Sequence, residues 1–231
     1  EVAQLFNDQA CVAAMARFEI ALAGAQAEHG VIPSDAAAQI QARASSFEGH
    51  LAAMGQSTAD ASVPTIELVN QMRYQINHPA SAYLHWGATS QDVVDTGLVL
   101  RLAQVLDLLE ERLRDLIGSL SRQADAHRRT VMPARTRYQQ ALPTSLGLKL
   151  ASWLAPLPRQ LERLQQLRPR VLCVQLGGAV GTLSALGNSG IAVMESVAKR
   201  LCLESPPMHW HSQRDGILEV AGWACTLTGV L

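Results

Sequence analysis

The chain has 231 residues, about one and a half times an average domain of roughly 150 residues, so it forms one large domain or two unequal ones. Hydrophobic residues make up 48% and charged residues 17%, which excludes a disordered chain and a chain that is only coiled coil. The formal net charge of −1 hides a local asymmetry.

Basic residues are concentrated in one segment. Residues 1–84 carry 3 basic and 8 acidic side chains, whereas residues 122–170 carry 10 basic and 2 acidic ones. Almost all of these basic residues are arginine, which suits an anionic ligand. Nucleic acid is the rival ligand, but the segment has no interleaved aromatic residues and no nucleic-acid-binding motif, so we expect no nucleic-acid partner.

The cysteine pattern and the hydropathy indicate a soluble cytoplasmic protein. The 4 cysteines lie far apart without a C-x-x-C pair, which argues against a disulfide framework or a zinc ribbon. No apolar run approaches the ~20 residues that span a bilayer, and the N-terminus lacks a signal-peptide pattern. We therefore expect no membrane partner.

Helical periodicity dominates, and strand signals are nearly absent. The periodicity predicts helices over residues 8–29, 34–44 and 64–77. Gly30 ends the first of these, and Ser34 or Asp35 caps the second.

The longest predicted helix runs from about Gln91 to the residues before Pro133. About 40 residues at 1.5 Å each span about 60 Å, whereas a compact globule of this chain length has a diameter of about 45 Å. The helix should therefore project beyond its own fold and be covered by another copy of the chain in a symmetric bundle. Its apolar stripe consists of Leu98, Leu102, Val105, Leu109, Leu113, Leu116 and Leu120.

Further helices are predicted over about 143–168 and 190–203, and from Ser212 or Asp215 onward. Pro143 suits a first helical turn, and Pro156 and Pro158 should kink the helix that follows. The glycine-rich segments 177–181 and 187–190 match no phosphate-loop motif and follow no strand, so they predict turns between helices. The helical pattern is still running at the last residue, so we expect a fragment of a longer protein.

Residues 85–92, which read His-Trp-Gly-Ala-Thr-Ser-Gln-Asp, precede the longest helix. Thr89 and Ser90 place two hydroxyls and free backbone N–H groups at its N-terminus, where the helix dipole favours an anion. The alternative is a plain N-cap, in which Thr89 or Ser90 holds the first turn and Asp92 complements the dipole.

Residues 135–144 join two predicted helices within the basic segment. Arginine and amide side chains that converge at such a corner can bind carboxylates in a bidentate manner. Solvated surface arginines are the alternative. Arg214, just before the last helix, could also reach an anion, whereas His209 and His211 lack a third ligand in register, so no metal site is expected.

Together, residues 85–92, 135–144, 178–182 and 213–215 resemble, in order, conserved blocks of the fumarase/aspartase superfamily, whose members add or eliminate across a C–C bond next to a carboxylate. Within the branch that includes adenylosuccinate lyase, residues 62–69, 83–86 and 95–100 are most similar to the carboxymuconate cycloisomerases. The resemblance covers almost the whole chain.

The sequence departs from the lyase pattern in two places. Arg137 stands where the lyases usually carry the histidine that donates a proton, and a guanidinium cannot be a general acid at neutral pH. This favours the cycloisomerases, which also lack that histidine. The family's mobile Gly-Ser-Ser loop, with the serine assigned as base, should lie beyond Leu231, so the chain as given is expected to lack a complete active site.

The resemblance implies an all-α fold with a small helical N-terminal domain, residues 1–84, and a long-helix bundle domain, residues 85–231. It also implies a homotetramer whose active sites draw on three chains. The implied reaction is a step of protocatechuate catabolism, the cyclisation of the tricarboxylate 3-carboxy-cis,cis-muconate to 4-carboxymuconolactone, without a cofactor.

An enediolate-like intermediate adds negative charge to an already trianionic substrate, so fixed positive charge and hydrogen-bond donors must stabilise it. The implied catalytic residues are His85, Ser90 and Arg137. The implied substrate-binding residues are Thr89, Gln91, Arg135, Thr136, Gln139 and Arg214.

Two alternatives remain. A related lyase that releases fumarate, such as one acting on adenylosuccinate, would share every block. A helical scaffold without catalytic activity is the other, because the expected base loop is missing from the sequence.

Overall fold

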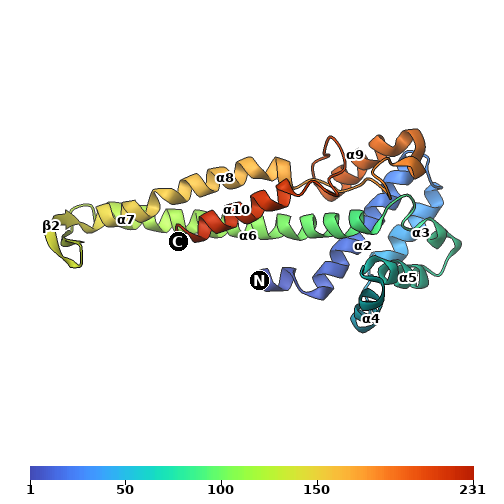
Figure 1. Cartoon of the computed structure of the whole chain (residues 1–231), viewed down its shortest axis with the longest axis horizontal. Helices are drawn as coiled ribbons and strands as arrows, with labels where there is room; N and C mark the ends of the chain where they lie inside the picture. Colours follow the sequence, from blue (N-terminus) through green and yellow to red (C-terminus); the bar gives the residue numbers. More distant parts are fainter. The chain divides into compact units, whose positions relative to one another are not determined.

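The computed structural model describes residues 1–231, and helices dominate it (Figure 1). The predicted all-α class is confirmed, with a single two-stranded sheet as the exception. Residues 1–105 and 169–214 form a first compact unit, and residues 106–168 and 215–231 form a second. The predicted domain boundary after residue 84 lies inside the first unit and stays a prediction.

Short helices built around a central one, together with residues 90–105 of the long helix, make up the first unit. The predicted helices over 8–29, 34–44, 64–77 and 190–203 are confirmed to within about two residues. The helix α4 was not predicted, because only Met54 of its residues is buried and its apolar pattern is correspondingly weak. The elements are α1 (Val2–Leu5), α2 (Asp8–Glu28), α3 (Ser34–Ala44), α4 (Leu51–Ala61), α5 (Thr65–Ile76), η1 (Pro79–Tyr83), η2 (Ser184–Ser189) and α9 (Gly190–Leu201).

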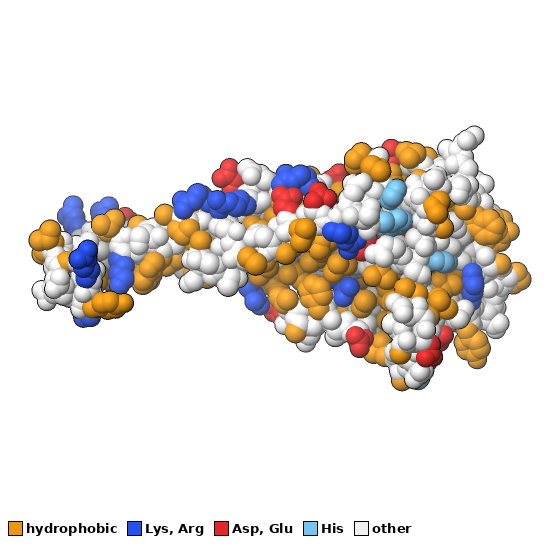
Figure 2. Space-filling view, viewed as in Figure 1, with side chains coloured by type: hydrophobic (Ala, Val, Ile, Leu, Met, Phe, Trp, Pro, Cys, Tyr) orange, Lys and Arg blue, Asp and Glu red, His pale blue; other side chains and the backbone are white.

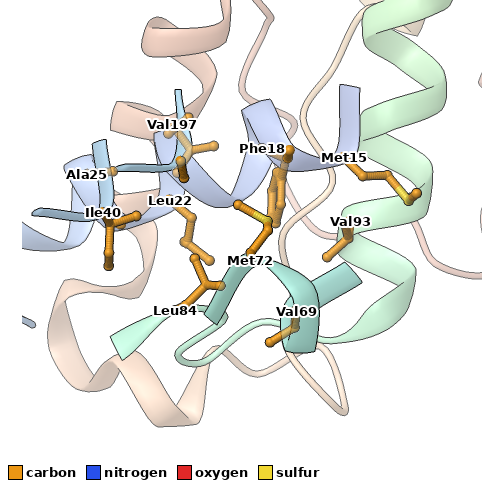
Figure 3. Packing of buried hydrophobic residues seen from close by; sticks show 14 of the residues in the cluster. Met15, Phe18, Leu22, Ala25, Ile40, Val69, Met72, Leu84, Val93 and Val197 are labelled. Atoms are coloured by element: carbon orange, nitrogen blue, oxygen red, sulfur yellow. The ribbon is translucent and has the colours of Figure 1, made fainter. Parts of the chain in front are cut away.

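The core of this unit forms around α2. Asn7 caps the helix by accepting a hydrogen bond from the Ala10 N–H at 2.8 Å, and Gly30, with φ of +69°, ends it as predicted. Phe18 and Leu22 of α2 are fully buried against Met72 of α5 and the neighbouring helices (Figure 3). The alanines of α2 allow its neighbours to approach closely.

The apolar sequence of α2 corrects one expectation. By length and composition alone, this helix could cross a membrane, although no such segment was expected. In the structure, 56% of its most apolar window is buried, so packing in the core accounts for its composition.

The long helix α6 (Ser90–Ala126) begins within one residue of the predicted start. It has 37 residues and ends earlier than predicted, because the chain turns into a strand at Val131. Val105 and Leu113 of its apolar stripe are buried, whereas the other five stripe residues keep part of their surface exposed.

The second unit packs α8 (Pro156–Val171) and α10 (Asp215–Thr228) along the C-terminal part of α6 (Figure 1). Leu157, Leu164 and Leu167 of α8 are almost completely buried. The Trp223 indole N–H of α10 donates to the Gln160 carbonyl at 3.0 Å, which satisfies the polar atom of a buried aromatic ring.

The second unit also corrects the predicted helix over 143–168. The chain forms an antiparallel hairpin of β1 (Val131–Thr136) and β2 (Gln139–Ser145), and then α7 (Leu146–Leu154). Arg137 and Tyr138 at its tip have φ of +46° and +64°, the left-handed conformation of a two-residue turn that matches strand twist. Pro133 lies opposite Pro143, which is tolerated because both strands of a hairpin are edge strands.

The residues after the hairpin explain where helices resume. The Ser145 hydroxyl, and not Pro143, starts α7, because it accepts a hydrogen bond from the Leu148 N–H at 3.1 Å. The expected kink is a break after Ala155, where α7 ends and Pro156 begins α8.

Candidate functional site

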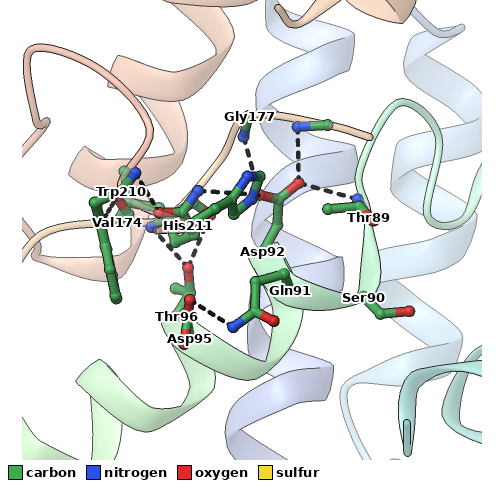
Figure 4. Close-up of polar contacts among 12 residues, drawn as sticks. Thr89, Ser90, Gln91, Asp92, Asp95, Thr96, Val174, Gly177, Trp210 and His211 are labelled. Carbon is green, nitrogen blue, oxygen red and sulfur yellow. Dashed lines mark hydrogen bonds and ion pairs between the residues drawn. The ribbon is translucent and has the colours of Figure 1, made fainter. Parts of the chain in front are cut away.

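The N-terminus of α6 is organised by a buried carboxylate. Asp92 has no exposed surface, and it accepts hydrogen bonds from several donors around it (Figure 4). Asp92 lies in the first turn of α6, where it complements the dipole as predicted, and its carboxylate also accepts a hydrogen bond from the Thr89 N–H. The donors are Thr89 N at 2.9 Å, Gly177 N at 2.9 Å, Gly178 N at 3.0 Å, Gln175 Nε2 at 3.3 Å and His211 Nε2 at 2.7 Å.

One helical turn further, Asp95 binds two of the predicted site residues. The Arg214 guanidinium donates two hydrogen bonds to the Asp95 carboxylate, at 2.7 and 3.0 Å, and stacks over the Trp210 ring at 5.3 Å. The hydrogen bond to Asp95 raises the pKa of Arg214 and outweighs its partial burial. Gln91 donates to the same carboxylate at 2.8 Å. Both side chains are thus held by Asp95, and their role toward substrate stays a prediction.

His85 is paired with a second buried carboxylate. Its Nδ1 lies 2.6 Å from an Oε1 of Glu19, which belongs to α2 and has no exposed surface. His85 adopts a left-handed φ of +63°, a conformation uncommon for a residue with a side chain. Such backbone strain in a non-glycine residue is found most often at functional positions.

The balance of forces on His85 favours its charged form. Burial is the largest single influence and lowers the pKa of His85, but the hydrogen bond and charge of Glu19, with the charge of Asp92, outweigh it. Arg73 opposes protonation slightly. The net result is a raised pKa, so His85 stays protonated to higher pH than an ordinary histidine.

His85 and Ser90 line one pocket of about 200 Å³ in the first unit. The Ser90 side chain points away from the Asp92 network (Figure 4), and its hydroxyl makes no hydrogen bond within the chain. Ser90 is the first residue of α6, and Thr89 directly precedes it, so both lie at the positive end of the α6 dipole. The remaining lining residues are Thr65, Ile66, Val69, Asn70 and Arg73.

The other four predicted site residues lie in the second unit. Arg135, Thr136, Arg137 and Gln139 are on the hairpin, all exposed, and none of their side chains makes a hydrogen bond or ion pair within the chain. Lys and Arg side chains gather at the end of this unit that carries the hairpin and α7 (Figure 2). In this single chain the arginines are solvated, and they are free to bind a ligand or a partner.

Sequence reasoning missed two residues of the first unit. Glu19 stands between Phe18 and Ile20 in α2, and a buried carboxylate is unusual enough to indicate a partner. Arg73 is one of only 3 basic residues in residues 1–84. This scarcity was the feature of the sequence that could have indicated a specific role for it. Neither residue lies in a block that resembles the superfamily.

Comparison with known proteins finds relatives that match almost the whole chain. The chain is 41% identical to a 3-carboxy-cis,cis-muconate cycloisomerase of Pseudomonas aeruginosa, over 98% of the chain and 50% of that protein. It is 37% identical to trans-aconitate decarboxylase 1 of Mycosarcoma maydis, over 100% of the chain and 47% of that protein. The chain thus spans about half the length of these relatives.

A solved structure is similar over the same region. The 3-carboxy-cis,cis-muconate lactonizing enzyme from Pseudomonas putida superimposes with a TM-score of 0.91 at 42% identity, covering 96% of this chain and 51% of that one. The family model described as "Lyase" matches residues 2–231. The chain therefore belongs to the lyase family of the fumarase/aspartase superfamily.

Proposed function

We propose that the full-length protein is a cycloisomerase that converts 3-carboxy-cis,cis-muconate into 4-carboxymuconolactone. The observation that carries the proposal is the carboxylate-anchored His85 beside Ser90, in a pocket at the N-terminus of α6. The similarity to muconate-converting enzymes supports the choice of substrate.

The reaction is an isomerisation, so atoms and electrons balance without a co-reactant. One carboxylate oxygen of the substrate forms a C–O bond to an alkene carbon, and the π electrons move to the carbon next to another carboxylate. The resulting enediolate-like species takes up one proton at that carbon. The reverse reaction removes this proton and breaks the C–O bond.

The site residues can supply the proton and the positive charge that this reaction requires. His85, protonated beside Glu19, is the candidate proton donor, and Ser90 and Thr89 donate hydrogen bonds to a carboxylate. Arg137 stabilises negative charge and cannot deliver the proton. Arg135, Thr136 and Gln139 bind a second carboxylate from the hairpin.

The proposal includes a homotetramer in which each site combines blocks from three chains. The partly exposed stripe of α6 and the exposed hairpin support it, because large unpartnered apolar and basic surfaces commonly mark interfaces. A small-molecule tricarboxylate is the proposed ligand of the assembled site.

The test presents three compounds to the full-length protein. We expect lactone formation from 3-carboxy-cis,cis-muconate, observed by NMR of the product. Decarboxylation of trans-aconitate in its place would favour a second candidate function, that of a trans-aconitate decarboxylase, which rests on the 37% identity to such an enzyme. Fumarate release from adenylosuccinate would indicate the lyase alternative, and no binding of any tricarboxylate would indicate a scaffold.

A further inference from the structure

The α5 side of the pocket carries an arginine that none of the family blocks contains. Arg73 donates from Nε to the Ser81 carbonyl at 3.3 Å and from Nη2 to the Leu84 carbonyl at 3.1 Å. Its Nη1 makes no hydrogen bond within the chain. The guanidinium is therefore held in place by two backbone carbonyls, with one donor group left for a ligand.

Arg73 is the cation of the pocket lining whose charge no carboxylate compensates. The other ionisable lining residue, His85, is paired with Glu19, so this pair adds little net charge. Asn70 lines the pocket as well, and its amide makes no hydrogen bond within the chain. A fixed guanidinium with amide, hydroxyl and imidazole donors is suited to a carboxylate.

The size of the pocket points to a small acid. About 200 Å³ is below the roughly 300–1,000 Å³ of pockets that enclose drug-sized ligands. Ile66 and Val69 add an apolar wall that suits a hydrocarbon chain between carboxylates.

We propose that Arg73, assisted by Asn70, binds one carboxylate of the substrate and is a specificity-determining residue for polycarboxylates. The inference rests on the proposed function for the identity of the substrate. Its physical content, an Arg73-dependent carboxylate subsite, can be tested without turnover.

The test measures binding of propane-1,2,3-tricarboxylate to the full-length protein by calorimetry. For Arg73→Met we expect Kd to rise by about 10- to 150-fold, the usual effect of losing a charged hydrogen bond. Arg43→Met is the matched control, because Arg43 also donates to a backbone carbonyl, that of Ile76 at 3.2 Å, and does not line the pocket. It should leave Kd unchanged.

A second variant guards against loss of the backbone contacts of Arg73. Asn70→Asp keeps those contacts and places a negative charge in the pocket, so we expect weaker binding by a similar factor. If Asn70→Asp and Arg73→Met both bind the tricarboxylate as tightly as the parent protein, the subsite does not exist.

Steady-state kinetics separates this inference from the proposed function. With 3-carboxy-cis,cis-muconate, Arg73→Met should raise KM with little change in kcat, because the lost contact is present in both ground and transition states. Turnover of the muconate with an unchanged KM would overturn the role of Arg73 and leave the proposed function standing. Arg73-dependent binding of the tricarboxylate without turnover of the muconate would overturn the proposed function and leave the role of Arg73 standing.

Discussion

The pairing of His85 with Glu19 is the most consequential contact between single residues. The two lie 66 positions apart in sequence, and the carboxylate is completely buried. Because its hydrogen bond and charge oppose the effect of burial, Glu19 is the main cause of the raised pKa of His85. In the proposed function, Glu19 is therefore a positioning residue that acts through His85.

Replacing Glu19 with glutamine should lower the pKa of His85. Glutamine keeps the shape of the side chain but removes the charge, so burial, which lowers this pKa, is no longer offset. If protonated His85 is the donor, the alkaline limb of the kcat/KM profile of the full-length protein moves to lower pH. The pH–rate profile and NMR titration of the imidazole measure both effects.

The control for this prediction is Glu28→Gln. Glu28 bonds to Ser196 and Arg200 and does not contact His85, so the alkaline limb should stay in place. An unmoved limb in Glu19→Gln would show that His85 is not the titrating donor. The raised pKa of His85 also makes its protonation stabilise the folded protein. This stabilisation is complete below about pH 6.5 and is lost as the pH rises through the pKa of His85 in the folded state.

Asp92 provides a second prediction about a single residue, this time on stability. In Asp92→Asn, an NH₂ group must face some of the N–H donors that the carboxylate now accepts, and those donors lose their partners. We expect the Gly177 and Gly178 amides to exchange hydrogen more readily, with a loss of local opening free energy of about 2–4 kcal/mol. Native-state hydrogen exchange measures this.

The comparison variant is Asp125→Asn. Asp125 is exposed and pairs with Arg128 at 3.4 Å, so its loss should change stability by less than about 0.5 kcal/mol. Equal protection of the two glycine amides in Asp92→Asn and parent protein would contradict the anchoring role of Asp92.

At the scale of elements, most helices were predictable because their apolar periodicity is strong. The bounds of α2, α3, α5 and α9 agree closely with the sequence pattern. Helical spacing also places Asp92 and Asp95 on one face, but the sequence does not show that this face is buried and that Ser90 points elsewhere. The partners Glu19 and Arg73 depend on tertiary packing, which local pattern does not encode.

The hairpin could not be predicted because its turn lacks the usual residues. Two-residue turns with left-handed backbone favour Asn-Gly or similar pairs, whereas Arg137-Tyr138 occupies this one. The strands are also interrupted by Pro133 and Pro143, which argue against strands in sequence analysis. The chain therefore keeps a costly turn that displays an arginine at its tip.

This cost gives a prediction for the hairpin. The double substitution Arg137→Asn with Tyr138→Gly should stabilise the hairpin by about 1–2 kcal/mol, because it relieves left-handed strain at two residues. In the full-length protein the same change should lower kcat/KM by about 30- to 1000-fold if Arg137 stabilises charge in the transition state. Hydrogen exchange of the cross-strand amides and steady-state kinetics measure the two effects.

Tyr138→Gly alone separates the two contributions. It relieves strain at one residue and keeps Arg137, so part of the stabilisation should remain while turnover is retained. Full activity in the double variant would remove Arg137 from the proposed site.

On the scale of the whole molecule, the predicted site residues divide between the two compact units, five in the first and four on the hairpin of the second. The hairpin arginines have no partner in their own chain, and the stripe of α6 is only partly covered. Both observations support an assembly in which other copies of the chain complete the surface. Leu142 of the hairpin and Leu148 of α7 extend this exposed surface, with 82% and 64% of their areas accessible.

The assembly predicts complementation between two inactive variants. In the full-length protein, His85→Gln and Arg137→Met should each abolish most activity alone. If His85 and Arg137 of one site come from different chains, tetramers that are unfolded together and reassembled from equal amounts should contain about a quarter of their sites with both native residues. Activity should then return to about a quarter of the parent value, while light scattering reports a four-chain mass for every sample.

Each subunit arrangement gives a different result in this mixing experiment. If both residues of a site came from one chain, every site in the mixture would carry one of the two substitutions. Activity would then stay at the level of the single variants. Leu148→Glu tests the exposed surface itself. If assembly buries this position, a carboxylate there opposes assembly and lowers the mass measured by light scattering. Tyr74→Glu, an exposed site on α5 in the first unit, is its matched control and should leave the mass unchanged. A single-chain mass for the parent protein would contradict the shared site, because the hairpin arginines would then have no neighbouring chain to reach.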